Sequence, residues 1–359
     1  MRAAVCHRFK EPLAVEEVQL DAPAADEVSV QVSACGVCHS DIAYMDGAWG
    51  GDLPAVYGHE VAGVVSDVGP DVESVTRGDH VVVTLVRTCR RCFYCLRGEP
   101  TQCEGTFAID QRSPIKFPNG TPVKQAMRVG GFAESVTVHS SQAIPIPSDV
   151  SLASACLLAC AVATGVGAVR NTARVEAGAS VAVVGAGGVG MNSIQGAAIA
   201  GADKIIAIDV SESRLAQARG FGATDTVNSR NDTAAGEVRS LTGGRGPDYT
   251  LITTGNPAAI QFGLGLSRRS GTTVIVGITG SGVTIPFDPG HLADSGSHVM
   301  GCKMGSIRPQ VDIPELVELY RTGKLKLDEL VTGRFGLDEV NEAVAATRRG
   351  EGLRAVIVF

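Results

Sequence analysis

The alternation of apolar and polar residues in the first 150 positions predicts a β-rich domain. The run Glu27-Val-Ser-Val-Gln-Val-Ser33 alternates with a period of two, which is typical of a half-buried strand. Two further runs, 61–68 and 80–85, are rich in valine and are bounded by glycine or aspartate. Short strands of this kind predict a barrel or a sandwich.

From about residue 180 the pattern changes to short apolar runs separated by stretches of helical length. This rhythm predicts parallel strands joined by helices, and hence a doubly wound sheet. Ser211 is suited to cap a helix over 211–219 that keeps Leu215 and Ala218 on one face. The predicted strands are 181–184, 204–208, 249–252 and 273–276.

A third pattern begins after about residue 303, with amphipathic helices over 314–322 and 337–348 and a last strand over 355–359. A chain of 359 residues exceeds the roughly 100–200 residues of an ordinary domain, so two domains are expected. The composition, 44% hydrophobic and 19% charged, predicts globular cores. The net charge of −7 offers no attraction to polyphosphates, so a nucleic-acid partner is not expected.

Two uncharged stretches, between Asp149 and Arg170 and between Glu176 and Asp203, reach the length of a membrane span. Glycine and polar residues interrupt both stretches, so neither is predicted to cross a membrane. The first ten residues contain no apolar run fit for a signal peptide. We therefore expect a cytoplasmic protein without membrane contact.

Four cysteines lie within fifteen residues in the pattern Cys89-x2-Cys92-x2-Cys95-x7-Cys103. A tetrahedral zinc takes four soft ligands that one loop can supply, and a filled four-sulfur shell leaves no position open for a substrate. The alternative, four free thiols in a loop, is disfavoured because such thiolates oxidise. The loop therefore predicts a structural zinc site.

A second set of metal-ligand residue types is dispersed along the chain. Cys38 lies in the run Cys35-Gly-Val-Cys-His-Ser-Asp41, His59 precedes Glu60, and Cys160 lies in an apolar stretch. Their spacing alone does not bring these residues together. Taken singly, Cys160 is compatible with a core position, and Cys35 with Cys38 is compatible with a redox pair.

A glycine-rich turn follows the predicted strand 181–184 and opens a helix. Its G-x-G-x-x-G pattern permits a tight turn, a close approach of a pyrophosphate and tight packing of helix on strand. Asp209, at the end of the next strand, can bond the ribose hydroxyls of an adenosine. Asp209 would repel a 2′-phosphate and Arg214 is the nearest following cation, so NAD is expected over NADP. The turn consists of Gly185, Ala186, Gly187, Gly188, Val189 and Gly190.

A front domain with a four-cysteine loop, followed by this nucleotide-binding pattern, resembles the zinc-dependent medium-chain alcohol dehydrogenases. The pattern Gly58-His-Glu-x2-Gly63-x5-Gly69-x2-Val72 fits the signature of that family, and the resemblance covers essentially the whole chain. It implies an α/β fold class with a GroES-like β-rich catalytic domain over 1–160, completed by 304–359. Residues 161–303 would form a Rossmann NAD-binding domain with a doubly wound parallel sheet.

The resemblance also implies roles for the dispersed residues. Cys38, His59 and Cys160 would bind a catalytic zinc with Glu60 as a close and sometimes ligating neighbour, and Asp41 would orient His59. With Cys38 alone matching a ligand, the redox-pair interpretation of Cys35 and Cys38 is set aside. Two zinc ions per chain and NAD are thus the expected cofactors.

Further residues match the family by position. Ser40 would take the proton of the alcohol, while zinc acts as a Lewis acid and a hydride passes to NAD. His39 and Arg354 would contact the cofactor pyrophosphate, and Thr164 and Val189 would flank the nicotinamide. Thr164 and Val189 are equally ordinary residues for a helix and a glycine turn.

Two positions depart from the family pattern and bear on the substrate. Ala43 replaces the histidine that in many relatives passes the proton to solvent. Phe107 replaces the arginine that the glutathione-dependent formaldehyde branch uses to hold the thiol's carboxylate. We therefore expect zinc- and NAD-dependent, reversible oxidation of a primary or aromatic alcohol to the aldehyde, by a homodimer or homotetramer. The alternatives are a thiol-adduct formaldehyde dehydrogenase and a non-catalytic nucleotide-binding sensor on the same fold.

Overall fold

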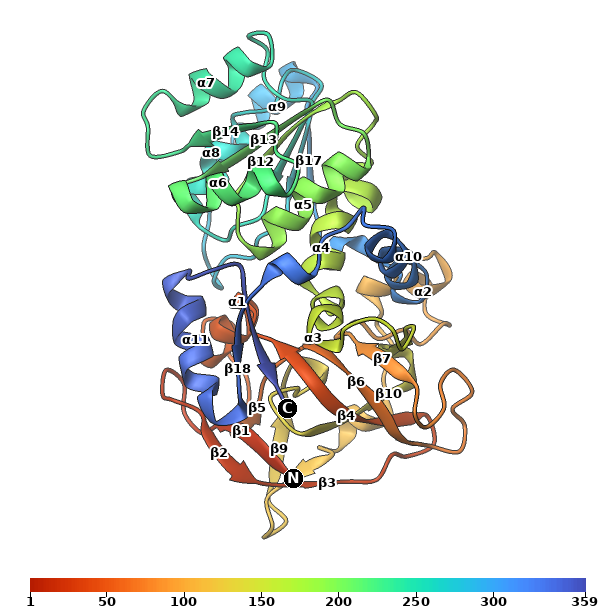
Figure 1. Cartoon of the computed structure of the whole chain (residues 1–359). Coiled ribbons are helices and arrows are strands. Elements are labelled where there is room, and N and C mark those ends of the chain that lie inside the picture. Colours follow the sequence, from red (N-terminus) through yellow and green to blue (C-terminus); the bar gives the residue numbers. More distant parts are fainter. The chain divides into compact units, whose positions relative to one another are not determined.

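Two units make up the computed structural model, which describes residues 1–359 (Figure 1). The first unit combines Met1–Ala161 with Arg308–Phe359, and the second is Val162–Ile307. The boundary expected after residue 160 therefore falls after residue 161, and the one expected after 303 falls after 307. Both chain termini belong to the first unit (Figure 1).

The first unit contains two sheets. One has the strand order β2-β1-β5-β9-β8-β3 and the other the order β11-β7-β6-β4-β19-β18, with β10 also pairing with β4. Most of their ladders are antiparallel, as the alternating sequence predicts for a barrel or sandwich. The strands are β1 (Arg2–Cys6), β2 (Ala14–Glu17), β3 (Gln19–Leu20), β4 (Glu27–Gly36), β5 (Ala55–Val56), β6 (Glu60–Val68), β7 (His80–Val83), β8 (Ile115–Lys116), β9 (Pro122–Gln125), β10 (Ser135–His139), β11 (Ala143–Pro145), β18 (Val331–Phe335) and β19 (Arg354–Val358).

Strand β4 is more deeply buried than its alternating sequence predicts. Gln31 is its one exposed residue, and even Glu27 and Ser29 are buried. Pairing with β6, β10 and β19 places β4 inside its sheet, and successive residues, which point to opposite faces, are buried along most of its length. Its valines contribute to one core together with those of β6 and β7 and with Leu337 and Val340 of the chain's C-terminal part.

The C-terminal segment completes the first unit through β19, which pairs antiparallel with β4. Helix α10 begins at Pro309 rather than at Pro314, where the sequence predicted a start. Proline is favoured at the first helical position, and Pro309 occupies it, so Pro314 lies inside the helix. The helices of this unit are α1 (His39–Met45), α2 (Phe93–Leu96), α3 (Leu152–Ala155), α10 (Pro309–Arg321) and α11 (Val340–Arg349).

The second unit is built on one parallel sheet with the order β14-β13-β12-β15-β16-β17. In chain order this is 3-2-1-4-5-6, the arrangement of doubly wound dinucleotide-binding folds. The predicted doubly wound sheet is therefore confirmed, with two strands, β14 and β17, that the sequence pattern did not single out. The strands are β12 (Ser180–Val184), β13 (Lys204–Asp209), β14 (Asp225–Asn228), β15 (Tyr249–Ile252), β16 (Thr272–Ile275) and β17 (His298–Gly301).

Helices connect these strands, and the predicted cap at Ser211 is present. Its side chain accepts a hydrogen bond from the N–H of Arg214 at the start of α6, and Leu215 and Ala218 are buried. The helices are α4 (Ala161–Gly167), α5 (Gly188–Ile199), α6 (Glu212–Gly220), α7 (Ala234–Leu241), α8 (Pro257–Leu264) and α9 (Pro289–Ser295).

No single helix of the chain is both long and apolar enough to cross a membrane. One bent pair, Leu152–Ala159 with Ala161–Ala173, passes that test on length and composition alone.

Candidate metal and cofactor sites

Strand pairing in the first unit brings three of the dispersed residues together. The register of β4 and β6 places Gly36 opposite Glu60. Cys38, just beyond β4, and His59, just before β6, therefore meet at the same end of this ladder. Cys160 joins them from the segment that follows the 3₁₀ turn Cys156–Ala159. The ligand atoms of Cys38, His59, Glu60 and Cys160 all lie within 4.8 Å of one another.

The chemistry of this cluster fits a zinc ion. Two thiols, an imidazole and a carboxylate are the donors that zinc takes in proteins. His59 and Glu60 are fully buried, and neither Nε2 of His59 nor either carboxylate oxygen of Glu60 has a hydrogen-bond partner. Buried polar atoms without partners are costly, so these atoms fit a metal that would bind them.

Asp41 fixes the cluster through hydrogen bonds to both segments that carry its ligands. Its Oδ1 lies 2.9 Å from Nδ1 of His59 and accepts the N–H of Gly58 at 2.9 Å, while Oδ2 accepts the N–H of Cys38 at 3.1 Å. The carboxylate thus fixes both ligand-bearing segments. A proton on Nδ1 leaves Nε2 free to bind a metal.

Arg354 lies against the same cluster. Its guanidinium is nearly fully buried, pairs with Oε1 of Glu60 at 3.3 Å without hydrogen-bond alignment, and donates to the carbonyl of Val37 at 3.4 Å. Burial raises the pKa of Glu60 to about 7, although the charge of Arg354 opposes this shift. A hydrogen bond with Cys160 holds the pKa of Cys38 well below its usual range, and Arg354 acts in the same direction. This favours the thiolate that a metal requires. The predicted contact of Arg354 with a pyrophosphate stays a prediction.

Helix α1 carries the residues expected to act beside this cluster. Ser40 lies in its first turn and is half-buried, and His39 is its exposed first residue. Ala43 follows Ser40 by three positions and so lies on the same side of the helix. Their places near ligand Cys38 agree with the predicted roles, which stay predictions.

The four-cysteine loop also assembles as the sequence predicts. The sulfur atoms of Cys89, Cys92, Cys95 and Cys103 lie within 4.8 Å of one another, with their side chains half-buried. Backbone N–H groups point at the sulfurs, as from Cys92 to Cys89 at 3.3 Å and from Cys95 to Cys92 at 3.5 Å. The N–H of Cys95 lowers the pKa of Cys92 to about 6, which favours a thiolate. The donor set fits a closed zinc site.

Two residues that flank this loop were missed by the sequence analysis. The hydroxyl of Thr88 donates to the sulfur of Cys95 at 3.2 Å. A Cβ on Gly105 would come within 2.5 Å of the Cβ of Cys89, so only glycine fits there. The short cysteine spacing revealed the ligands, but nothing in the pattern indicated these supporting residues.

The glycine-rich turn of the second unit has the geometry expected of a cofactor-binding turn. Gly185 has a φ of +98°, which favours glycine, and a Cβ on Gly190 would meet the carbonyl oxygen of Gly185 at 1.8 Å. Gly187 caps α5, and nothing lies within 4 Å of the place its Cβ would take. This open space at a helix N-terminus fits a pyrophosphate. Thr253, which the sequence analysis missed, donates to the carbonyl of Gly185 at 2.6 Å.

Asp209 ends β13 beside this turn. Its Oδ2 accepts the N–H of Ala186 at 2.7 Å and its Oδ1 accepts the N–H of Ser211 at 2.9 Å. Arg214 lies 3.9 Å from Oδ2. The carboxylate is thus fixed next to the glycine turn, where the sequence analysis placed the adenosine ribose.

Three further residues named from the sequence lie in the following surroundings, and the predicted places of Thr164 and Val189 beside the nicotinamide stay predictions. Thr164 on α4 is buried and donates to the sulfur of Met304 at 3.7 Å, and Val189 lies on α5. Phe107 is buried, with its ring 4.7 Å from that of His139 and 5.4 Å from the guanidinium carbon of Arg87. Phe107 is therefore packed into the first unit.

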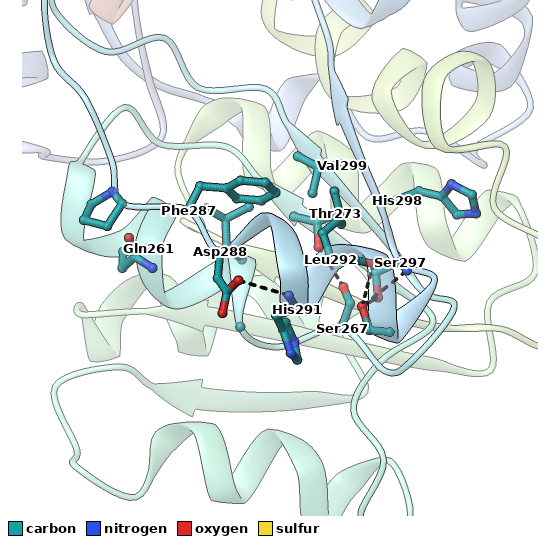
Figure 2. A pocket seen from close by; sticks show the side chains of 14 residues that line it. Gln261, Ser267, Thr273, Phe287, Asp288, His291, Leu292, Ser297, His298 and Val299 are labelled. Carbon is teal, nitrogen blue, oxygen red and sulfur yellow. Dashed lines mark hydrogen bonds between the residues drawn. The ribbon is translucent and has the colours of Figure 1, made fainter.

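A separate hollow of about 180 Å³ lies in the second unit (Figure 2). It is lined by residues of α8, α9, β16 and β17, among them Gln261, Asp288, His291 and Val299. Figure 2 shows Asp288 beside His291, whose N–H it accepts at 3.0 Å as the cap of α9. None of the predicted site residues lines this hollow.

Comparison with known proteins gives matches along the whole chain. Residues 24–148 match the family described as Alcohol dehydrogenase GroES-like domain, and residues 188–322 match the family described as Zinc-binding dehydrogenase. An NDMA-dependent alcohol dehydrogenase of Amycolatopsis methanolica is 37% identical over 99% of this chain and 98% of its own. An S-(hydroxymethyl)glutathione dehydrogenase of Paracoccus denitrificans is 35% identical over 100% of this chain and 99% of its own.

Solved structures agree with these matches. The benzyl alcohol dehydrogenase of Acinetobacter calcoaceticus superposes with a TM-score of 0.92 at 32% identity, over 100% of this chain and 99% of the other. An alcohol dehydrogenase zinc-binding domain protein of Burkholderia ambifaria gives a TM-score of 0.95 at 36% identity, over 100% of this chain and 98% of the other.

Proposed function

Because the chain belongs to the zinc-dependent medium-chain alcohol dehydrogenases, we propose that it oxidises a primary or aromatic alcohol to the aldehyde and passes the hydride to NAD. Membership confirms the predicted GroES-like and Rossmann fold class, and the named relatives support an oxidoreductase rather than a non-catalytic sensor. The observation that carries the proposal is the convergence of Cys38, His59, Glu60 and Cys160 in one buried cluster.

Residues of the first unit have separate roles in alcohol oxidation: binding zinc, orienting a ligand and accepting the proton. Cys38, His59 and Cys160 would hold a zinc ion, which when bound supplies a Lewis acid for the alcohol oxygen. Asp41 keeps His59 in the tautomer and orientation that bind. Ser40, two residues after Cys38, accepts the alcohol proton through its hydroxyl. Ala43 has no ionisable group, so the proton must leave Ser40 by another route.

The second unit would hold the cofactor. The open helix N-terminus at Gly187 would receive the pyrophosphate, and Asp209 the ribose hydroxyls. NAD supplies the hydride acceptor. The fixed carboxylate of Asp209 excludes an added 2′-phosphate by charge repulsion.

Three observations bear on the substrate class. A benzyl alcohol dehydrogenase is among the similar structures, which favours an aromatic alcohol. The thiol-adduct alternative is favoured by the relatives named S-(hydroxymethyl)glutathione dehydrogenase. Against it, Phe107 replaces the arginine of that branch and is buried against His139.

A panel of substrates separates these two functions. NADH formation is followed with benzyl alcohol, with ethanol, and with formaldehyde in the presence and absence of glutathione. We expect benzyl alcohol to give the highest kcat/KM without any thiol. A rate that appears only with formaldehyde and an added thiol would replace our proposal by the alternative.

We expect Ser40→Ala to lower kcat at least about tenfold, because the alcohol loses its first proton acceptor. Ser40→Thr retains a hydroxyl at the same position and should keep most of the activity. The measurement is kcat with benzyl alcohol at saturating NAD. Full activity in Ser40→Ala would remove Ser40 from the proton path.

We expect Asp209→Gly to relax the preference for NAD over NADP, because the carboxylate that repels a 2′-phosphate is gone. The measurement is the ratio of kcat/KM with the two cofactors. Glu212→Gln, which removes an acid from the neighbouring first turn of α6, is the control and should leave the ratio unchanged. An unchanged ratio in Asp209→Gly would show that this carboxylate does not discriminate.

We further propose that two copies of the chain pair through β17. This strand ends its sheet, so one edge has unpaired backbone groups, and Val299 and Met300 on it are each 39% exposed. An identical strand related by a two-fold axis can pair with this edge. Val299→Lys should shift the mass in light scattering towards one chain, whereas Val311→Lys, at an exposed position on α10, should not. A wild-type protein with the mass of one chain would contradict this pairing.

A further inference from the structure

The backbone that carries Cys160 is irregular, so something other than helix geometry must hold it. Cys160 follows the 3₁₀ turn Cys156–Ala159 and precedes α4, with φ −143° and ψ −72°. A side chain from the end of β7 reaches this break. The hydroxyl of Thr84, which is fully buried, donates to the carbonyl of Ala159 at 2.9 Å. Thr84 therefore fixes the peptide that joins Ala159 to Cys160.

Thr84 is itself held by Gln142. The N–H of Thr84 donates to the carbonyl of Gln142 at 3.1 Å, and Nε2 of Gln142 donates to the carbonyl of Thr84 at 2.8 Å. Gln142 is fully buried and precedes β11, while Thr84 follows β7. Thr84 and Gln142 therefore add one pair to the ladder of β7 and β11. One of the two bonds in this pair is made by the side chain of Gln142.

Gln142 also contacts a buried arginine. Its Oε1 accepts Nε of Arg87 at 2.6 Å, and both side chains donate to the carbonyl of Arg128. Arg87 is 1% exposed and forms an ion pair with Asp110. A guanidinium buried this deeply is stable only while its partners stay in place, so the group is rigid.

The same group reaches the four-cysteine loop. Thr88, next to Arg87, donates its N–H to the hydroxyl of Ser141 at 3.1 Å and its own hydroxyl to the sulfur of Cys95 at 3.2 Å. Residues 87 and 88 are thus bonded to 142 and 141, in two adjacent contacts. Hydrogen bonds, together with the peptide links Arg87–Thr88 and Ser141–Gln142, thus connect the loop sulfur to the peptide before Cys160.

We propose that Thr84 and Gln142 are positioning residues for Cys160, and that Arg87 and Thr88 connect them to the four-cysteine loop, so that the two metal sites share one rigid support. Cys160 would keep its place in the catalytic cluster only while this support is intact. Disturbing it near the loop would then weaken metal binding at both sites. The proposal rests on the proposed zinc function only in that both sites must bind zinc.

The first test is the rate at which zinc leaves each site. Excess pyridylazo-resorcinol, a chromogenic chelator, is added to the zinc-loaded protein, and the phases are assigned with Cys160→Ser and Cys95→Ser. We expect Thr84→Val to release the zinc of the Cys160 site about tenfold faster and to leave the loop zinc unchanged. Thr347→Val is the matched control, because Thr347 is a buried threonine whose hydroxyl also donates to a carbonyl, that of Ala343.

The second test addresses the connection between the sites. We expect Arg87→Met to accelerate release from both sites, each by about tenfold. Asp110→Asn removes the charge that pairs with Arg87, and this variant replaces Arg87→Met in the test if Arg87→Met does not fold. Ile144→Val, a purely apolar change on β11, controls for general loss of stability and should leave both rates unchanged.

Two results would overturn the proposal. Release from the Cys160 site at the wild-type rate in Thr84→Val would show that this hydroxyl does not position Cys160. If Arg87→Met and Asp110→Asn accelerate zinc release from the four-cysteine loop alone, the two sites are independent. Neither result bears on the substrate, so a failure here is distinct from a failure of the proposed alcohol oxidation.

Discussion

Cys160→Ser is expected to lower kcat/KM by more than about a hundredfold while the protein stays folded. Loss of a partner that only supports a ligand already costs about 10–100-fold in affinity or activity, and here a thiolate ligand itself is replaced by a hydroxyl. The fold should survive because Cys160 lies at a break between helices and contributes one small side chain to its surroundings. The measurements are the rate of NADH formation and the zinc content per chain.

The matched control is Cys156→Ser. Cys156 is a fully buried cysteine four positions earlier in the same segment, its thiol donates to the carbonyl of Ala153 at 3.3 Å, and it lies outside the donor cluster. We expect Cys156→Ser to keep its zinc and most of its activity. Equal activity losses in the two variants would mean that packing, and not metal binding, explains the effect.

Cys95→Ser is expected to lower stability before it affects the chemistry. Removing one of four sulfur ligands opens the closed site, and metal binding at such sites contributes to folding free energy. A loss of about 3–4 kcal/mol would lower the unfolding midpoint by on the order of 10 °C in a unit of this size. The midpoint is measured by circular dichroism on zinc-loaded protein.

Arg91→Ser is the control for Cys95→Ser, because Arg91 is an exposed residue of the same loop. The unfolding midpoint of Arg91→Ser should equal that of the wild type. The midpoint of Cys160→Ser should lie within a few degrees of the wild-type value. A wild-type midpoint in Cys95→Ser would show that the loop zinc, if bound, does not stabilise the fold.

The features that the sequence predicted well are those with local causes. The four sulfurs of the loop lie within fifteen residues, so one turn of backbone can bring them together. The glycine turn is equally local, because strand, turn and helix follow one another directly. The inner strands β12 and β13 are buried along nearly their whole length, so they stand out as apolar runs, whereas the exposed edge strand β17 does not.

The cluster of Cys38, His59 and Cys160 has a different origin. Its residues meet because β4 pairs with β6 in one particular register, and because the turn before Cys160 packs against β6. Neither the register nor this packing follows from local periodicity. The resemblance to a family was therefore needed to group these residues before the structure placed them together.

The support around Cys160 could not be predicted from the sequence at all. Thr84 and Arg87 lie at the end of a valine-rich run that predicts only a strand, and Gln142 lies in a short polar stretch. Their burial and their mutual bonds depend on tertiary contacts between segments far apart in the chain. The start of α10 shows a related limit, since two prolines, Pro309 and Pro314, are both compatible with a helix start.

The most direct test of the account is the dependence of benzyl alcohol oxidation on zinc. Zinc is removed from the Cys160 site with a chelator, the remaining metal per chain is measured, and NADH formation is followed before and after zinc is returned. We predict that the rate falls in proportion to the zinc lost from this site and recovers when zinc is restored. A full rate in folded protein that metal analysis shows to lack this zinc would contradict the account.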